Sequence, residues 1–318
     1  MSKIEQGAEV LDKLRLKRLM VNDSDLDNYA SQVGLDEHTT IRKPNDFMEE
    51  TIDYFESGGM MQGSALGFPL HKDKAFRFQD RQVTAWSGFN GHGKSMFLNQ
   101  VLLHFILDED QPCLMISPEM SPKMQLARWV RQFVKKSLPT RDDILRFCDE
   151  VDDKLFIYDF ENAVSSTRII NAIIYATDKL KAKHIVIDSL MKISDVDSED
   201  YGKQREFLNT LCALAKSQEC HIHLVAHSRK AFDEDQPPNK MDVMGSSNLI
   251  NQCDQLVTVW RNKQKEKVDP DLLSDDDKEK WRRKPDAEVH IQKNRHGDFE
   301  GVLKFWFDSP TLTYREKP

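Results

Sequence analysis

A glycine-rich stretch, GFNGHGKS at residues 88 to 95, has the residue types and spacing of a phosphate-binding loop. It fits the pattern G-x-x-x-x-G-K-[ST] at every fixed position and directly follows RQVTAW, a short strand-forming segment. Glycines let backbone N–H groups close around phosphate oxygens at a helix N-terminus, where the helix dipole favours anions. The residues expected to bind a nucleotide here are Gly88, Asn90, Gly91, His92, Gly93, Lys94, Ser95 and Met96. Among them, Lys94 would reach the outer phosphates and Ser95 would bind Mg²⁺.

Two carboxylates follow strand-like segments farther along the chain. Asp188 ends the buried run HIVID, and an acid at that strand end can orient the water molecules of a bound Mg²⁺. Glu119, in SPEM, follows the strand after the first helix, and a carboxylate there can polarise an attacking water. The alternative for Glu119 is an acid that only pairs with a helix dipole, and the pattern alone does not separate the two.

Three further side chains are candidates for sensing or stabilising phosphate charge. His227 ends the segment IHLVAH, where a histidine can hydrogen-bond a terminal phosphate, although a lone histidine is often only satisfied locally. In QKNRHG, Lys293 and Arg295 alternate with Asn294, so on a strand both point to one face. The two cations either form an ordinary surface or complete the site of a neighbouring subunit.

Alternating strand-like and helix-like segments must hold these residues in place. Such alternation predicts an α/β fold with a mostly parallel sheet and helices on both faces. Three later strands have no long helix between them and are expected to pair antiparallel at one sheet edge; the charged stretch from 263 to 286 is expected to be solvated. The expected strands are residues 82–86, 113–116, 155–158, 184–187, 222–226, 255–260, 288–292 and 303–308, and the main helices are 95–107, 121–134, 166–180 and 203–217.

Composition limits the class of protein. The chain has 318 residues, 39% of them apolar, which is enough for one large α/β domain and a small appendage. No apolar run reaches the roughly 20 residues of a membrane helix, and the N-terminus lacks secretory features, so a cytoplasmic location is expected. The five cysteines are far apart and are expected to be reduced. The net charge of −8 argues against a surface coated by nucleic acid, but it allows a confined basic strip.

Taken together, the motifs resemble those of the DnaB-type (superfamily 4) hexameric replicative helicases. These are RecA-like ATPases, and the resemblance leans towards the branch of the phage primase–helicases and Twinkle. It covers roughly residues 67–315. It rests on GFNGHGKS, SPEM, HIVIDS, VAHSRK leading into MGSSNLINQCDQLVTVWRNK, and KNRHGDFEG.

This resemblance implies roles for the motif residues. Lys94, Ser95 and Asp188 would bind MgATP, Glu119 would activate water and His227 would sense the γ-phosphate. Arg295, assisted by Lys293, would be an arginine finger for the neighbouring subunit's ATP. Arg261 and Phe307 match positions that sandwich the adenine base. The segment from 228 to 248 matches a loop that holds single-stranded DNA, with the DNA-binding candidates Arg229, Lys230, Lys240, Ser246 and Asn248.

The resemblance also divides the chain and shows two departures. Residues 1–42 would be a small helical N-terminal segment, 43–66 a linker helix and linker, and 67–318 the RecA-like ATPase domain. The helix near 45–56 would pack either on the next subunit of a ring or on its own domain. His296 stands where an aromatic residue is common in these branches, so the resemblance assigns no stacking role to this position. The 87 residues before Gly88 are too few for a primase domain, so another protein would have to prime.

We therefore expect an ATP-driven, ring-forming DNA helicase of a phage or similar replicon, a homo-hexamer translocating 5′→3′ on single-stranded DNA and unwinding forked duplex. A separate primase, polymerase and loader would be further partners, with no membrane. Two alternatives remain open: a RecA-like single-strand-binding recombination ATPase, and a regulatory P-loop ATPase with no nucleic-acid partner. Unwinding of forks, filament formation and DNA-stimulated hydrolysis separate the three.

Overall fold

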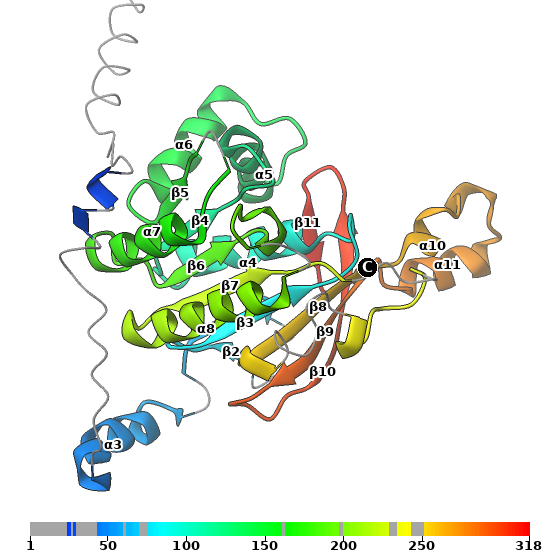
Figure 1. Ribbon diagram of the computed structural model, residues 1–318. Coiled ribbons are helices and arrows are strands. Elements are labelled where there is room, and N and C mark those ends of the chain that lie inside the picture. The colour runs from blue at the N-terminus through cyan, green and yellow to red at the C-terminus, as the bar shows by residue number, and fades with distance from the viewer. Residues whose placement is uncertain are drawn as a thin grey trace, which may run out of the picture.

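The strand before the glycine-rich loop lies inside a wide sheet that crosses the molecule (Figure 1). The computed structural model describes residues 24–26, 28–29, 43–59, 62–69, 76–160, 163–196, 200–228, 234–242 and 251–318. Within these residues nine strands form this sheet, in the order β11-β10-β9-β8-β3-β7-β6-β4-β5. The strands are β3 Val83–Ser87, β4 Cys113–Ile116, β5 Leu155–Tyr158, β6 His184–Ile187, β7 His221–Val225, β8 Gln255–Arg261, β9 Ala287–Asn294, β10 Gly301–Asp308 and β11 Thr313–Arg315.

The sheet is mostly parallel, with an antiparallel edge, as the sequence predicts. Strands β8, β3, β7, β6, β4 and β5 pair in parallel, whereas β9, β10 and β11 each run antiparallel to the neighbour before them. The three late strands pair antiparallel with one another as predicted, β8 with β9 and β9 with β10, and β8 joins them to the parallel part by pairing in parallel with β3, where Ala85 stands opposite Leu256. The chain between β7 and β8 is long enough for a crossover although no long helix was expected there.

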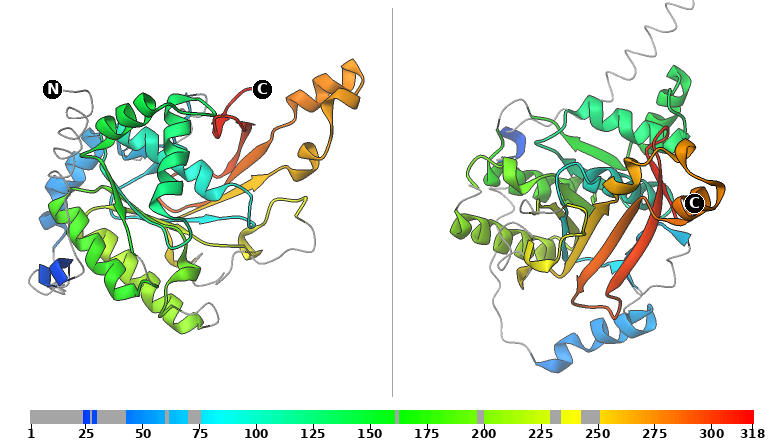
Figure 2. Two further views of the ribbon diagram at one scale, coloured as in Figure 1. Left: turned by 90° about the horizontal axis from the view of Figure 1, so that it is seen from above. Right: turned by 90° about the vertical axis from the view of Figure 1, so that its right-hand side faces the viewer.

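Helices cover both faces of the sheet. Successive side chains of each strand point to opposite faces, and both faces are apolar and must be covered. Trp86 belongs to the core cluster on one face and Ala85 to the cluster on the other, as expected for successive strand positions. Residues of α4, α5 and α6 join the first cluster, and those of α7 and α8 join the second, so the helices lie on opposite sides (Figure 2). The helices are α4 Lys94–Leu107, α5 Pro122–Val134, α6 Arg141–Val151, α7 Ser166–Lys179 and α8 Tyr201–Ser217.

The connection between β8 and β9 projects from the body of the molecule (Figure 1). It holds α10 Lys263–Glu266, the short 3₁₀ helix η6 Pro270–Leu272, and α11 Asp275–Arg283. Ser274 caps α11, and the three aspartates of its first turn suit the positive end of the helix dipole. No residue of α11 is buried, which agrees with the expected solvated excursion. The two ends of this connection are joined by Lys265 of α10, whose buried ammonium lies 2.7 Å from Asp286 Oδ1.

On the N-terminal side of the sheet's first strand, a helix stands apart from the sheet (Figure 1). The 3₁₀ helix η1 Pro44–Phe47 leads into α3 Met48–Glu56, and neither contains a buried residue. Phe47, Ile52 and Phe55 are exposed, Phe55 at 72%. A small two-stranded sheet, β1 Ser64–Ala65 with β2 Arg77–Phe78, follows. Two short 3₁₀ helices, η4 Leu190–Lys192 and η5 Lys240–Asp242, complete the named elements of the described chain.

Of the N-terminal segment at 1–42, which was expected to be helical, the structure describes only residues 24–26 and 28–29, and these are helical. Tyr29 packs edge-on against Tyr175 of α7, with ring centroids 5.7 Å apart. Across the described chain, no helix combines the length and the apolar character that crossing a membrane would require.

Candidate nucleotide-binding site

The glycine-rich loop joins the end of β3 to the start of α4, as the sequence predicts. Gly88 and Gly93 have φ angles of 144° and 86°, in a region that favours glycine. A Cβ atom on Gly88 would lie 2.3 Å from the carbonyl oxygen of Val259, and one on Gly93 would lie 2.4 Å from the hydroxyl of Tyr314. Both positions therefore require glycine, because the loop is pressed between β8 and β11.

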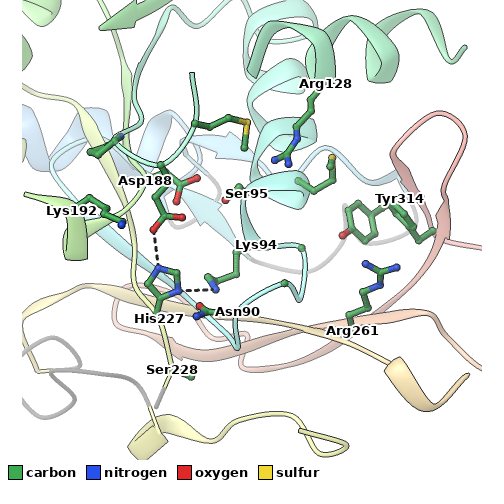
Figure 3. A pocket seen from close by; sticks show the side chains of 17 residues that line it. Asn90, Lys94, Ser95, Arg128, Asp188, Lys192, His227, Ser228, Arg261 and Tyr314 are labelled. Atoms are coloured by element: carbon green, nitrogen blue, oxygen red, sulfur yellow. Dashed lines mark hydrogen bonds and ion pairs between the residues drawn. The ribbon is translucent and has the colours of Figure 1, made fainter. Parts of the chain in front are cut away.

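A cavity of about 1050 Å³ opens beside this loop, at the carboxyl end of the parallel strands. This is the edge at which ligands bind in open α/β sheets. Figure 3 shows the side chains around it. Its lining residues are Asn90, Gly91, Gly93, Lys94, Ser95, Met96, Pro118, Glu119, Met120, Arg128, Asp188, Lys192, His227, Ser228, Arg261, Phe307 and Tyr314. The structure thus gathers most of the predicted nucleotide-site residues around one cavity.

Lys94 is folded back over its own loop. Its ammonium donates to the carbonyl oxygens of Gly88, at 2.9 Å, and Phe89, at 3.1 Å. Burial lowers the pKa of Lys94 to about 8, against a partial opposing effect of Asp188 and Glu119. The ammonium is thus held at the phosphate loop itself, where it can contact phosphate oxygens.

Asp188 and Ser95 supply oxygen atoms that suit a Mg²⁺ ion. Asp188 is only 3% exposed, and burial raises its pKa, while a hydrogen bond with Ser95 opposes this rise. Its Oδ1 atom is buried and has no hydrogen-bond partner among the described residues. In the part of the chain that the structure describes, no cluster of three or more His, Cys, Asp or Glu side chains could hold a metal ion by itself. Mg²⁺ commonly binds through one or two protein oxygens together with phosphates and water, so this pair fits it.

Glu119 is held by two neighbours at the end of β4. Its Oε1 accepts a 2.6 Å hydrogen bond from Ser189 Oγ and lies 3.0 Å from His227 Nε2. The hydrogen bond with His227 is the main reason that the pKa of Glu119 falls to about 2, despite partial burial. Glu119 is therefore ionised. While it is hydrogen-bonded to His227, the carboxylate is better suited to orient a water molecule than to accept a proton from that water.

Arg261 and Phe307 lie at the far end of the cavity, where the resemblance places the base. The Arg261 guanidinium carbon is 5.6 Å from the centre of the Phe307 ring, and Arg261 also pairs with Glu266. A base between them needs two stacking contacts of about 3.5 Å each, so roughly 7 Å. The two side chains are brought together as predicted, but they must move apart to enclose a base.

His92 differs from the other loop residues because its side chain turns away from the cavity. It is fully buried; its Nδ1 accepts a hydrogen bond from the backbone of Arg261 and its Nε2 lies 3.4 Å from Glu234. Burial and the nearby Lys263 lower the pKa of His92 to about 4, so it is neutral near pH 7. Of this residue, only the backbone is available to phosphates.

Lys293 and Arg295 lie far from this cavity. In the β8–β9 register Asn294 stands opposite Gln255, at the other end of β8 from Arg261, and neither cation lines the cavity. Arg295 donates to Asp254 Oδ1 at 3.2 Å and to the Asn251 carbonyl at 2.6 Å, and its side chain is 43% exposed. The Lys293 ammonium donates to the Cys253 carbonyl at 2.6 Å. The chain's own cavity therefore lacks both cations.

The predicted DNA contacts are only partly described. Arg229, Lys230, Ser246 and Asn248 lie outside the described residues. Lys240 lies in η5, and its ammonium is 3.3 Å from Glu300 Oε2. His296, the residue in place of an aromatic, is half exposed and its Nε2 is 3.5 Å from Asp254 Oδ1.

Sequence reasoning missed four cavity residues with polar side chains, Arg128, Lys192, Ser228 and Tyr314; Ser228 was expected only as the start of the DNA loop. Arg128 lies on α5 and Lys192 in η4, and neither belongs to a motif with a characteristic spacing. Tyr314, from β11, reaches the loop only because the last strand folds back beside β10. The only signal was its aromatic character near the end of a strand-like segment.

Comparison with known proteins adds relatives of this arrangement. A family model described as an AAA domain matches residues 77–233, which include the phosphate loop and the segments through His227. The circadian clock oscillator protein KaiC of Acaryochloris marina (strain MBIC 11017) is 31% identical over 121 residues, which cover 35% of this chain and 21% of KaiC. The chain thus spans about a fifth of the length of this curated relative.

Two solved structures are similar over most of the chain. One, described as an ATPase domain, has a TM-score of 0.68 at 16% identity, covering 87% of this chain and 99% of that domain. The other, described as a DnaB-like replicative helicase and its interactions with primase, has a TM-score of 0.66 at 16% identity, covering 98% of this chain and 75% of the other. The protein therefore has the RecA-like fold of the ATPase domains of DnaB-like replicative helicases.

Proposed function

We propose that this protein hydrolyses ATP in a ring of identical subunits and uses the energy to translocate on single-stranded DNA and unwind duplex DNA. The observation that carries the proposal is the separation of the phosphate loop from Lys293 and Arg295. The carboxyl ends of the parallel strands hold a cavity with the loop, two carboxylates and a histidine. Two cations, fixed by backbone carbonyls, lie at the opposite end of β8.

A pair of cations so placed suits the ATP of another copy. Arg295 is oriented by Asp254 and still 43% exposed, so it can reach outwards while its base is held. A positive charge supplied to a transferring phosphoryl group stabilises the transition state strongly, by about 10³–10⁵ in rate in the known arginine fingers. Cooperation between copies is then built into the reaction, because each site needs a neighbour.

Within one subunit the residues have distinct proposed parts. Lys94 and the loop amides would bind the phosphates, while Ser95 and Asp188 would hold a Mg²⁺ ion, whose charge would offset that of the phosphates. Glu119 would orient the attacking water, and His227, which contacts both Glu119 and Lys94, would report the presence of the last phosphate. Arg261 and Phe307 would enclose the base.

The helix α3 supports assembly into a ring. Its apolar side chains are exposed, as noted above, although free surfaces seldom carry several large apolar residues together. Packing of α3 on the next subunit would cover them, which favours the division into an N-terminal segment at 1–42, a linker at 43–66 and an ATPase domain at 67–318. The basic residues after β7, Arg229, Lys230 and Lys240, together with Ser246 and Asn248, would contact DNA, and the proposed polarity is 5′→3′.

The similarity to KaiC favours one other function, a regulatory ATPase without a nucleic-acid partner. A RecA-like filament on single strands is a third. Both would use the same phosphate loop, so nucleotide binding alone does not separate them from a helicase.

Three measurements on the purified chain separate these functions. A helicase should show ATPase activity stimulated by single-stranded DNA, ATP-dependent unwinding of a forked duplex, and closed rings in electron micrographs with an ATP analogue and DNA. Filaments without unwinding would identify the recombination ATPase. Hydrolysis that does not respond to DNA would leave the regulatory ATPase and contradict our proposal.

A further inference from the structure

The buried His92 connects the phosphate loop to a segment that follows β7. Its Nδ1 accepts the backbone N–H of Arg261, at 3.1 Å, so in the neutral ring the proton is on Nε2. That Nε2–H points to Glu234 Oε2 at 3.4 Å, a long hydrogen bond to a carboxylate. Phe89 packs edge-on against the ring, with centroids 5.3 Å apart, and closes its other side. The side chain therefore has two polar partners outside the loop, the Arg261 backbone and the Glu234 side chain, and only Glu234 belongs to the segment after β7.

Glu234 itself is fixed from several directions. Lys263 Nζ lies 2.8 Å from its Oε2, and the Trp260 indole N–H donates to its carbonyl oxygen at 3.0 Å. The segment 234–242 therefore begins against the end of β8, directly beside the phosphate loop. At the start of the same connection, the Ser228 amide donates to the Gly88 carbonyl at 3.1 Å. Both flanks of residues 229–233 are thus attached to the phosphate loop or its immediate neighbours.

The other end of the segment reaches the edge that carries Arg295. The Pro238 carbonyl accepts from Gln292 of β9 at 2.8 Å, and Lys240 pairs with Glu300. Glu300 Oε1 in turn accepts the backbone N–H of Asn294, the residue before Arg295, at 3.3 Å. One short segment thus contacts the chain's own phosphate loop at Glu234 and, at its opposite end, is joined through Glu300 to the backbone of Asn294, which lies between Lys293 and Arg295.

We propose that Glu234, acting through His92, is a positioning residue that links the phosphate loop to the segment 234–242. Nucleotide on the loop orders this segment, and a ligand held by the segment changes the turnover of ATP in the same subunit. Only the identity of that ligand, single-stranded DNA, rests on the proposed function. The link itself does not, because coupling between two sites is reciprocal and can be measured with nucleotide alone.

Hydrogen exchange tests the link without DNA. In the wild-type protein, saturating Mg²⁺ and a non-hydrolysable ATP analogue should slow amide exchange in 234–242 by about fivefold or more, the lower range of measured couplings. Glu234→Ala and His92→Met should each abolish this response, and His92→Met leaves the sequence of the measured segment intact. Glu234→Gln should keep most of it, because the amide oxygen still accepts from His92.

Asp235→Ala is the matched control. It removes the same charge one residue along, from a side chain that accepts a hydrogen bond from Gln264, so the response should stay at the wild-type level. An unresponsive segment in the wild-type protein, or an equal response in Glu234→Ala and Asp235→Ala, would overturn the inference.

The DNA assay separates the two hypotheses. At saturating DNA, Glu234→Ala should reduce DNA-stimulated turnover about fivefold relative to Asp235→Ala, while the DNA affinity measured without nucleotide should be unchanged. Equal stimulation in these two variants would also overturn the link. If the wild-type ATPase does not respond to DNA at all, the proposed function fails, and the exchange experiment still decides whether Glu234 is linked to the phosphate loop.

Discussion

His227 bridges Lys94 and Glu119 in the cavity. Its Nε2 lies 3.0 Å from Glu119 Oε1, and its Nδ1 lies 3.5 Å from Lys94 Nζ (Figure 3). A lysine ammonium can only donate a hydrogen bond, so Nδ1 of His227 accepts from Lys94. The Nε2–H of the same ring then donates a hydrogen bond to Glu119. A histidine in this position contacts both the cation that would bind phosphate and the carboxylate that would orient water. Any group that moves Lys94 therefore acts on Glu119 as well.

Glu119→Gln should bind ATP and DNA almost normally and turn over slowly. Glutamine keeps the contacts with Ser189 and His227 but loses the negative charge, and removal of such a group typically costs on the order of 10²–10⁴ in rate. Steady-state turnover and nucleotide affinity, measured together, check this. Glu109→Gln is a matched control, since Glu109 pairs with His104 at 3.1 Å outside the cavity. A variant that loses nucleotide affinity would make Glu119 a structural residue.

ATP affinity should fall as the pH rises above 8. Burial lowers the pKa of Lys94 to about 8, so the free protein loses the ammonium proton through that pH. Phosphate binding favours the charged form, so ATP binding takes up a proton there and the affinity should fall up to about tenfold per pH unit. Lys94→Arg should flatten this dependence, since the guanidinium keeps its charge. An affinity that is constant from pH 7 to 9.5 would show that Lys94 does not contact the phosphates.

The motif residues and the sheet were predictable because each motif is tied to a strand end. Lys94, Glu119, Asp188 and His227 all follow buried strands, and the carboxyl ends of parallel strands meet at one edge. Periodicity therefore locates these side chains without any knowledge of packing. The same argument separates Lys293 and Arg295 from them, because antiparallel β9 ends at the opposite edge.

Features that depend on packing between distant segments were not predictable. The parallel pairing of β8 with β3 depends on a crossover that the sequence pattern did not mark with a long helix, and the entry of Tyr314 into the cavity depends on the last strand folding back. Three core histidines were missed for the same reason. His184 and His223 lie 3.1 Å apart between Nδ1 and Nε2, and Trp86 donates to His223, so polar residues are paired inside an apolar sheet.

Those histidines should make the fold sensitive to acid. Burial lowers the pKa of His221 to about 4 and lowers those of His184 and His223 as well, so the unfolded chain binds more protons below pH 6.5. The contribution of these histidines to stability should be constant above pH 6.5 and fall below it, by up to about 1.4 kcal/mol per pH unit for each histidine. Urea unfolding at pH 7 and pH 5 measures this. In His221→Gln the free energy of unfolding should depend less steeply on pH between 7 and 5, by the equivalent of about one proton. An unaltered dependence would contradict the low pKa of His221.

DNA affinity should fall steeply with salt although the protein is acidic overall. Each phosphate contact releases counterions, so the double variant Lys230→Ala, Lys240→Ala should reduce the slope of log affinity against log salt by about one to two. Lys278→Ala, on the exposed α11, is the control and should leave the slope unchanged. Titrations of labelled single strands at several salt concentrations give the slopes. Equal slopes in the double variant and the control would place the DNA site elsewhere.

Arg295→Ala tests whether ATP sites are shared between subunits. The variant should bind ATP almost normally, because its own cavity is intact, and its turnover should fall by about 10³ or more. Asp254→Asn should resemble it in a milder form, since Asp254 orients the guanidinium at 3.2 Å. A cation that acted in the same subunit would also lower turnover, so the single variants alone do not decide the question.

Mixing Arg295→Ala with Lys94→Ala decides it. In a mixed ring, some interfaces join the intact phosphate loop of the Arg295 variant to the intact Arg295 of its neighbour. Those interfaces should recover ATPase activity although each variant alone is inactive, and the recovery should pass through a maximum at intermediate ratios. Co-assembly must first be shown with differently tagged variants. Given co-assembly, no recovery at any ratio would mean that Arg295 does not act on a neighbour's ATP, because every subunit would then carry a lethal defect of its own.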